Sequence, residues 1–378
     1  MNNAIKGHLC VVFAQEHYNP LGMIRGLGIN GVNPIYISVK RRGEVATKSK
    51  YISKLHRVDS VEEGYKLLFE KYGYFDFNHR PFVLFSDDKC IGYFDERFDE
   101  VKNKFIVYNA NRSNGINFYM NKFNIQQLAK KHGFKILKSY VVEKGEIPDD
   151  LIFPIITKDI SPNSGAWKSD VFICENKKEL IDAFDKIESS KILLQRYINK
   201  KNEIALQGYS INDGKDIHII TAMDWKYLIK GYYSPYHNVY PFNNCSIESK
   251  LKAMFSEIGF NGIFEVEFLI DQDEIVYFTE INFRASAWNH TTNYAGMAES
   301  YLWVKGMIDG KISAEDRKIF DSFTSMSEII DYGKRVDTGI ISLQEWIRDF
   351  KKAKCTYYYN EEDMGPFEYV ADKWDEYK

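Results

Sequence analysis

Residues 278–290, FTEINFRASAWNH, carry a row of polar side chains where a β-strand is expected. Glu280, Asn282 and Arg284 stand at every second position, and alternate residues of a strand point to the same face of a sheet. A carboxylate, an amide and a guanidinium on one face are costly to bury unless something pairs with them. The row is therefore either the solvent-facing side of a strand or part of a polar binding site.

The residues before this row favour a binding site. GIFEVEFLIDQDEIVYFTEINFR has the pattern of a β-hairpin with an acidic turn. With a symmetric turn, Glu267 lies opposite Phe278 and diagonal to Glu280, within reach of long side chains. Two carboxylates and an amide oxygen are hard ligands, which suit Mg²⁺ or Mn²⁺ better than zinc. We therefore expect Glu267, Glu280 and Asn282 to bind a metal, with Arg284 beside them to contact phosphate.

A site for a metal-bound nucleotide also needs cations elsewhere, and three lysines are candidates. Lys158 ends the apolar run FPIITK, directly before the loop SPNSGAW, whose backbone N–H groups could wrap phosphate oxygens. Lys168 closes this loop, and Lys122 stands at the start of an expected helix. A single lysine is more often a solvated surface charge. Their order along the chain, upstream of the acid pair, favours nucleotide binding.

The elements that must position these residues fall into two regions. Strands are expected at 8–14, 34–39 and 81–88 and helices at 19–32 and 60–73, an alternation typical of a parallel, Rossmann-like α/β sheet. From residue 120 to about 310 the pattern is α+β. There a helix and strand at 120–142, strands at 153–159, 169–174 and 191–198, a helix at 176–190 and a hairpin about Asn-Asp-Gly 212–214 are expected. The pattern after about residue 311 indicates no clear elements.

Composition limits the classes of function. The 378 residues are enough for two or three domains, and the formal net charge of −3 argues against nucleic-acid or anionic-membrane binding. The five cysteines contain no C-x-x-C pair, which argues against disulfides and cysteine zinc sites. The apolar run near the start is too short for a signal peptide or a membrane span. We therefore expect a cytoplasmic protein.

These motifs resemble those of ATP-grasp enzymes, within them the carboxylate–amine ligase branch that includes D-aspartate ligase. The resemblance covers residues 5–310, and its most specific piece is EVEFLIDQDEIVYFTEINFR, an acid, a short turn and E-x-N-x-R. It implies a Rossmann-like N-terminal domain followed by an ATP-grasp fold, in which two α+β subdomains clasp ATP. The implied boundaries are 1–115 for the N-terminal domain, 116–192 for the small subdomain with its phosphate loop, 193–310 for the large subdomain with the metal site, and 311–378 for a C-terminal extension.

The resemblance also implies roles for individual residues. Arg284 is the catalytic, phosphate-stabilising residue, and Asp88 faces the acceptor side. The metal ligands are Glu267, Glu280 and Asn282. The nucleotide-binding residues are Lys122, Lys158, Lys168, Gln195, Arg196, Tyr197, Ile198, Glu203 and Lys226. Of these, residues 195–198 line the purine pocket mainly through backbone groups, and Glu203 takes the ribose hydroxyls.

The implied reaction is ATP- and Mg²⁺-dependent ligation of a small-molecule carboxylate to an amine through an acyl phosphate, with His290 and Asp88 as candidate general bases. Two alternatives stay open. The first is an ATP-binding sensor or scaffold that does not ligate, because Asp159 replaces the usual proline and Gln195 replaces the commoner acid. The second is a metal-dependent hydrolase, although no His-rich or Asp-rich cluster supplies a nucleophile activator. Dimers are common in the family, so a homodimer is one assembly open to this chain.

Overall fold

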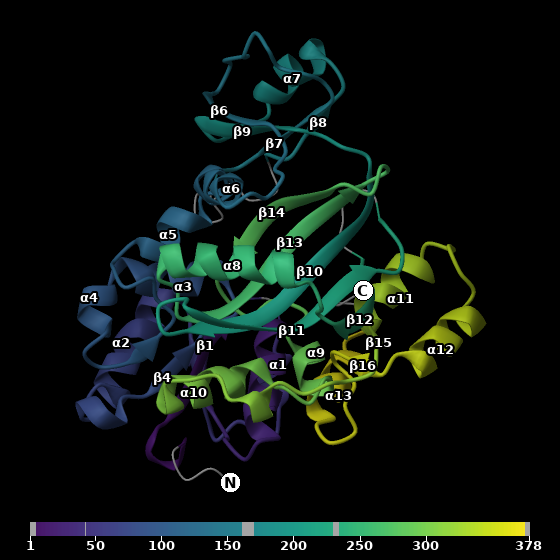
Figure 1. The fold of residues 1–378 in the computed structure, drawn as a ribbon. Coiled ribbons are helices and arrows are strands. Elements are labelled where there is room, and N and C mark those ends of the chain that lie inside the picture. Colours follow the sequence, from purple (N-terminus) through teal and green to yellow (C-terminus); the bar gives the residue numbers. More distant parts are fainter. Residues whose placement is uncertain (1–4, 42, 161–169, 230–233, 375–378) are drawn as a thin grey trace.

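The structure is a computed structural model that describes residues 5–41, 43–160, 170–229 and 234–374. These residues form three β-sheets with helices packed around them (Figure 1). In Figure 1 the smallest sheet lies at the top, the largest sheet crosses the middle, and the N-terminal sheet lies below and to the left. The candidate site depends on how the three sheets meet.

The N-terminal sheet has five parallel strands in the order β3-β2-β1-β4-β5. This is the strand order of doubly wound sheets, which bind ligands outside the carboxyl ends of their strands. The strands are β1 (Cys10–Gln15), β2 (Ile35–Val39), β3 (Lys54–Val58), β4 (Phe82–Leu84) and β5 (Ile106–Val107). The helices are α1 (Asn19–Gly28), α2 (Val61–Tyr72), α3 (Asp88–Glu96) and α4 (Phe98–Val101).

The sequence predicts β1, β2, β4, α1 and α2 but misses β3, β5, α3 and α4. The three predicted strands are continuous apolar runs, typical of strands covered on both faces. The sequence of β3, KLHRV, is mostly polar, because β3 is an edge strand in which only Val58 is buried. Its place in the sheet comes from pairing with β2 rather than from its own hydrophobic pattern.

The small sheet has four antiparallel strands in the order β6-β9-β7-β8 and a separate hydrophobic core. The elements of this region are α5 (Gly115–Met120), α6 (Lys122–Lys131), β6 (Ser139–Glu143), β7 (Ile155–Lys158), β8 (Ile173–Cys174), α7 (Lys177–Phe184) and β9 (Lys191–Arg196). Asn121 caps α6 by accepting from the N–H groups of Phe123 and Asn124. In Figure 1, α6 lies between the small sheet and β14 of the large sheet, so Lys122, at its first turn, starts at the junction of the two.

The large sheet has seven strands in the order β14-β13-β10-β11-β12-β15-β16. Its strands are β10 (Lys200–Ile211), β11 (Asp216–Trp225), β12 (Tyr236–Pro241), β13 (Gly262–Asp271), β14 (Val276–Asn282), β15 (Phe323–Met326) and β16 (Cys355–Thr356). The helices that follow or cover it are α8 (Cys245–Ile258), α9 (His290–Tyr294) and α10 (Glu299–Asp309). The predicted Asn-Asp-Gly turn joins β10 to β11, with all three residues at positive φ.

The C-terminal region completes the large sheet, which the sequence pattern does not indicate. Strands β15 and β16 are only four and two residues long, too short for a periodic signal. Helices α11 (Glu328–Arg335), α12 (Leu343–Lys352) and α13 (Gly365–Ala371) belong to the same region. The buried Arg25 of α1 holds it in place, since its guanidinium donates to a carboxylate oxygen of Asp363 at 2.8 Å and to backbone oxygens of Tyr357, Tyr358 and Asp363.

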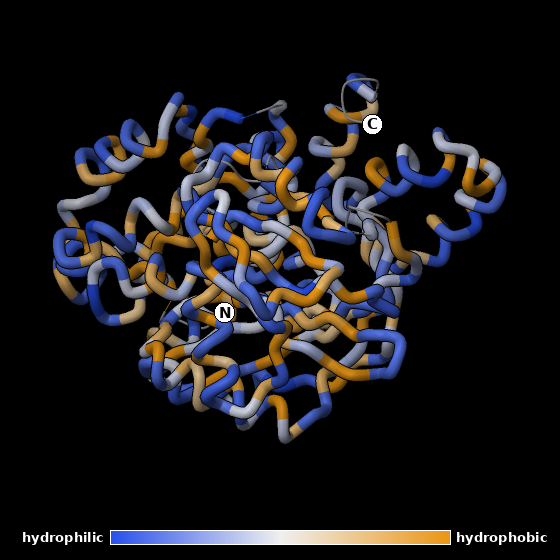
Figure 2. Tube along the Cα trace, turned by 90° about the horizontal axis from the view of Figure 1, so that it is seen from above, coloured by the Kyte–Doolittle hydropathy of each residue, from blue (hydrophilic) through white to orange (hydrophobic). Residues whose placement is uncertain are grey.

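One continuous hydrophobic core joins the N-terminal and large sheets. Helix α1 packs on α9 so closely that a Cβ at Gly22 would overlap the side chain of Asn289. In the view from above, polar and apolar residues are interspersed along the whole trace (Figure 2). In the part of the chain that the structure describes, no helix is long and apolar enough to cross a membrane.

Candidate functional site

The β13–β14 hairpin brings the two predicted carboxylates face to face. The predicted register is wrong, because Glu267 pairs directly with Glu280, and Phe268, not Glu267, pairs with Phe278. Two features cause the difference. Ile270 pairs with Val276 across an odd-numbered turn, and a β-bulge at Thr279, whose hydroxyl donates to the backbone oxygen of Glu267 at 2.8 Å, shifts the register once more. The bulge lets Phe278 point into the core while Glu280 points into the site. Without the bulge, the observed turn would place Glu267 opposite Thr279 and put Glu280 on the other face of the sheet.

A third carboxylate, Glu265, belongs to the same cluster. It pairs with Asn282 across the hairpin and is buried. The Asn282 amide donates to Glu265 at 3.0 Å and to Glu267 at 2.9 Å. The other oxygen of Glu265, Oε1, is buried without a hydrogen-bond partner among the described residues. The alternation E-V-E of β13 was the signal for Glu265, because residues two apart share a face.

The surroundings of Glu280 and Glu267 shift the pKa values of these two carboxyl groups in opposite directions. Burial alone would raise the pKa of Glu280, but Lys122, Lys158 and Arg284 together lower it below its ordinary value. Lys122 Nζ lies 3.5 Å from a Glu280 oxygen. Burial and the neighbouring carboxylates, Glu280 foremost, raise the pKa of Glu267 well above its ordinary value. Burial and the nearby carboxylates therefore favour the protonated form of Glu267.

This donor set fits a magnesium ion. The oxygens of Glu267, Glu280 and Asn282 are hard donors, the unpartnered Glu265 oxygen lies beside them, and the repulsion at Glu267 is what a divalent cation would relieve. Among the described residues, no three His, Cys, Asp or Glu side chains form a complete metal-binding group by themselves. That agrees with Mg²⁺ chemistry, in which one or two carboxylates bind and waters and phosphates fill the remaining positions.

Lys158 ends β7 in the small sheet, and the charges of Glu280, Glu267 and Glu203 act on it. Its Nζ donates to Oε1 of the buried Gln195 at 3.0 Å, and Gln195 in turn donates to Ser139 at 2.9 Å. An acid at position 195 would neutralise the lysine, whereas the amide orients the lysine without neutralising it. Burial lowers the pKa of Lys158, and Glu280 acts in the opposite direction. The Lys122 N–H donates to the Ile160 oxygen at 2.9 Å, which ties the start of α6 to the chain just after Lys158.

Arg284 follows β14 and reaches the N-terminal sheet. Its guanidinium donates to Asp88 at 3.2 Å and to Asn282 at 3.1 Å. Asp88 is the first residue of α3, which Asp87 caps at the carboxyl end of β4. Burial alone would lower the pKa of Arg284, but Asp88 and Glu265 raise it above its ordinary value, so the guanidinium stays charged.

One cavity of about 460 Å³ is lined by the three hairpin carboxylates, Asn282, Lys122, Asp88 and Arg284, but not by Lys158 or Gln195. Its lining residues that carry charge are Arg41, Asp88, Lys122, Glu203, Glu265, Glu267, Glu280 and Arg284. Trp225 and Trp288 form an aromatic part of the wall. Glu203 also forms an ion pair with Lys200. The cavity therefore draws on the N-terminal sheet, α6 and the large sheet, as a nucleotide site between domains would.

The structure does not bring every predicted residue to this cavity. Lys226 lies apart, with Nζ 3.4 Å from Asn238 Oδ1. The other predicted residues absent from the cavity lining are Lys158, Gln195, Arg196, Tyr197 and Ile198, and their roles stay predictions. The backbone N–H groups of Arg196 and Tyr197 bond to the oxygens of Lys138 and Pro154, both at 2.9 Å. Lys168 and the predicted phosphate loop, residues 161–169, lie outside the described residues.

His290 is not positioned to act as a general base in this cavity. It begins α9, is buried, and lines a different cavity on the other side of Trp288 and Tyr357. Burial lowers its pKa well below the ordinary value. Of the two candidate bases, only Asp88 lines the cavity that holds the carboxylates.

Comparisons with known proteins place the fold. No protein family and no curated protein matches the sequence. Among solved structures, the L-amino acid ligase from Bacillus licheniformis superposes with a TM-score of 0.63 at 12% identity, over 84% of this chain and 79% of that chain. The N5-carboxyaminoimidazole synthetase from Staphylococcus aureus, complexed with ADP, gives 0.65 at 16% identity, over 89% and 86%.

A biotin carboxylase from Campylobacter jejuni, in complex with beta-gamma-ATP, gives a TM-score of 0.63 at 16% identity, over 83% of this chain and 74% of that chain. The similarity to these proteins thus extends over most of each chain. The chain has the ATP-grasp fold that they share, and the fold class predicted from the sequence is confirmed.

Proposed function

We propose that the chain is an ATP- and Mg²⁺-dependent ligase that joins a carboxylate to an amine through an acyl phosphate, releasing ADP and phosphate. The fold supports ATP as the phosphate donor, because two of the similar structures hold ADP or beta-gamma-ATP. The observation that carries the proposal is the convergence of Glu267, Glu280 and Asn282 from one hairpin with Lys122 of α6 and Arg284 in a single cavity.

Glu267, Glu280 and Asn282 would hold the metal, which when bound neutralises the charge on the terminal phosphates of ATP. Glu280 also pairs with Lys122, and its lowered pKa keeps it ionised at neutral pH. Lys122 and Lys158 approach it from the small-sheet side, where they would bind phosphate oxygens. Glu203, which lines the same cavity, would accept hydrogen bonds from the ribose.

The reaction needs a good leaving group on the acid, since an oxide ion does not leave a carboxylate at neutral pH. An oxygen of the substrate carboxylate attacks the γ-phosphorus, and ADP leaves. The amine nitrogen then attacks the acyl carbon, phosphate leaves, and the nitrogen loses a proton. Arg284 stays charged and faces the cavity, so it would stabilise the negative charge that develops in both steps.

Asp88 has two roles in this proposal. Its ion pair with Arg284 fixes the guanidinium between the N-terminal sheet and the hairpin. Asp88 comes from α3, next to the N-terminal sheet, whereas the other carboxylates that line the cavity come from the large sheet. It is therefore the carboxylate we assign to the acceptor side, where an incoming amine would release its proton.

The test is ADP release with purified protein, MgATP and a matrix of carboxylates and amines, with mass spectrometry of the products. Glu280→Gln should abolish pair-dependent ADP release. Glu274→Gln is the matched control, because Glu274 is an exposed residue at the turn of the same hairpin. ATP binding without turnover on any pair would favour the sensor alternative, and ADP release without a condensed product would favour a hydrolase.

A further inference from the structure

One part of the 460 Å³ cavity has no role in the proposed reaction. It is largely aromatic, and three segments build it: the end of β11, the chain that follows β14 and the chain that follows β1. Three of its side chains, Tyr18, Trp225 and Trp288, are more than nine-tenths buried, so they are not part of the outer surface of the protein. The residues of this part, which we call the aromatic wall, are His17, Tyr18, Asn19, Trp225, Ala287 and Trp288.

The strand pairing puts Trp225 and the metal-site carboxylates on one face of the large sheet. Ala205 of β10 pairs with Glu267 of β13 and with Met223 of β11, so these three residues share a face. Trp225 is two residues beyond Met223 on β11, and it therefore points to the same face as Glu267. Two strand spacings, roughly 10 Å, separate β13 from β11. A small-molecule substrate bound at the metal can thus extend across β10 to the aromatic wall.

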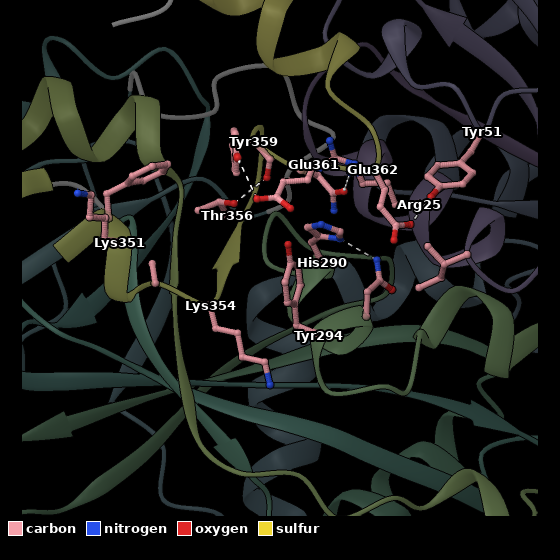
Figure 3. A pocket seen from close by; sticks show the side chains of 15 residues that line it. Arg25, Tyr51, His290, Tyr294, Lys351, Lys354, Thr356, Tyr359, Glu361 and Glu362 are labelled. Carbon is pink, nitrogen blue, oxygen red and sulfur yellow. Dashed lines mark hydrogen bonds between the residues drawn. The ribbon is translucent and has the colours of Figure 1, made fainter. Parts of the chain in front are cut away.

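Further rings hold the two tryptophans in place. The ring centroid of His237, on β12, lies 4.8 Å from that of Trp225 and 4.4 Å from that of Trp288, both in edge-to-face geometry. Tyr357 also packs edge to face on Trp288, with centroids 5.7 Å apart. His290, whose ring is 6.3 Å from Tyr357, lines a separate cavity of about 510 Å³ (Figure 3). The aromatic wall is therefore backed by packed side chains and is formed before a ligand binds.

The aromatic wall contains no charged group. His17 Nδ1 lies 2.7 Å from Asn19 Oδ1, and an amide oxygen only accepts hydrogen bonds, so Nδ1 carries the proton. Burial and, to a lesser degree, the charge of Arg41 lower the pKa of His17 to about 4, so its ring is neutral at pH 7. Arg41 itself lines the cavity but is an exposed residue, and Arg284 pairs with Asp88. The wall therefore favours an uncharged group over an acidic one.

We propose that the aromatic wall binds a large apolar group, aliphatic or aromatic, that one of the two ligase substrates carries. Preformed aromatic surface in a cavity binds such groups by burying their apolar area. This inference rests on the proposed function, which assigns MgATP and the reacting carboxylate to the hairpin side of the cavity. It adds the substrate class: an acid or an amine with a side chain like that of leucine or phenylalanine rather than an acidic one.

The test is calorimetric titration of the full chain, saturated with Mg²⁺ and a non-hydrolysable ATP analogue. Two series of ligands are made from glycine, L-alanine, L-leucine, L-phenylalanine and L-glutamate. The N-acetyl series keeps the α-carboxylate and the amide series keeps the α-amino group, so the series that binds shows which substrate carries the apolar group. In that series we expect Kd to fall about tenfold or more from the glycine compound to the leucine or phenylalanine compound. The glutamate compound should bind no better than the glycine compound.

The variant Ala287→Leu should fill part of the space at the aromatic wall. We expect it to raise Kd for the leucine and phenylalanine compounds about tenfold or more relative to Kd for the glycine compound. Ala314→Leu is the matched control, because Ala314 is exposed and does not line the cavity. If Ala287→Leu does not fold, the two series on the parent protein still decide the proposal.

Three results would overturn the proposal: no binding in either series, no gain in affinity from glycine to leucine or phenylalanine in either series, or weaker binding of the ATP analogue by folded Ala287→Leu. The third would show that the aromatic wall holds the nucleotide. Failure of the ligase proposal would instead show as absent ADP release while the apolar compounds still bind. ADP release with small or acidic pairs alone would refute the apolar site and leave the ligase proposal intact.

Discussion

The two paired glutamates should respond to the same substitution with opposite changes in stability. Glu267 and Glu280 are directly opposite in the hairpin, where Cβ atoms are roughly 4.5–5.5 Å apart. At about 5 Å and an effective dielectric constant of about 20, two negative charges repel by about 3 kcal/mol. Lys122, 3.5 Å from Glu280, stabilises that residue but not Glu267 to the same degree.

Glu267→Gln removes the repulsion and keeps an oxygen that can accept from Asn282. We expect the metal-free protein to be stabilised by about 1–2 kcal/mol, because lost attraction to Arg284 offsets part of the gain, and Tm to rise by about 1–3 °C. Glu280→Gln leaves Lys122 and Lys158 without their carboxylate. We expect a loss of stability of similar size, about 1–2 kcal/mol.

The pH dependence of stability tests the direction of each stability change separately. The raised pKa of Glu267 means that the parent loses stability as pH rises from the ordinary glutamate range to the higher pKa of the folded state. The lowered pKa of Glu280 contributes stability above the ordinary range, which is lost as pH falls through the folded pKa. The benefit of Glu267→Gln should therefore appear only above about pH 4.3, the ordinary value for glutamate.

The assay is calorimetric melting of both variants, of Glu274→Gln and of the parent from pH 4 to 8, with chelator, without nucleotide and at low salt. Melting is then repeated with Mg²⁺ and a non-hydrolysable ATP analogue, which should stabilise the parent and the control but neither site variant. If both site variants shift Tm in the same direction without metal, the assigned charge balance is wrong. If either retains the full stabilisation by MgATP analogue, that residue is not a metal ligand.

Three further outcomes are expected. Arg284→Ala should lower kcat about 10²–10³-fold with a smaller change in KM for ATP, measured by ADP release, and a loss confined to KM would contradict its role in the transition state. Arg25→Met leaves the buried Asp363 carboxylate unpaired and should cost about 3–5 kcal/mol in urea denaturation, whereas an unchanged midpoint would show that the C-terminal region is not held by this pair. Gly208→Ala places a Cβ against the His218 carbonyl oxygen at a bulge of β10, so it should lower Tm by several degrees. The MgATP dependence of the remaining folded protein should not change. A parent-like Tm would contradict the close packing at Gly208.

Elements with a strong period of their own were predictable from the sequence. The apolar run of β1, the amphipathic α2 with its Ser60 cap, and the Asn-Asp-Gly turn between β10 and β11 each carry a local signal. Strand β3 and the short strands β15 and β16 carry no such signal, because these segments become strands by pairing with their neighbours. The candidate site shows the same contrast: its motifs are local in the sequence, but their meeting depends on contacts between distant segments.

The residue types of the site were also local information. The sequence E-x-N-x-R, its upstream acid and the lysines after FPIIT and at the start of α6 determined which chemistry was available. The alternation E-V-E puts Glu265 on the same face as Glu267. The sequence could not show that one Glu265 oxygen would lack a partner among the described residues, or that Gln195 would orient Lys158 without neutralising it.

Tertiary structure decided which of these groups meet. The bulge at Thr279 set Glu267 against Glu280, and the packing of α1 on α9 put His290 in a different cavity from the carboxylates. The first outcome depends on a one-residue shift in the pairing of two strands. The second depends on contacts between helices that are distant in the chain. A period-2 pattern specifies the face of each side chain only while the register is regular, and a single extra residue reverses it.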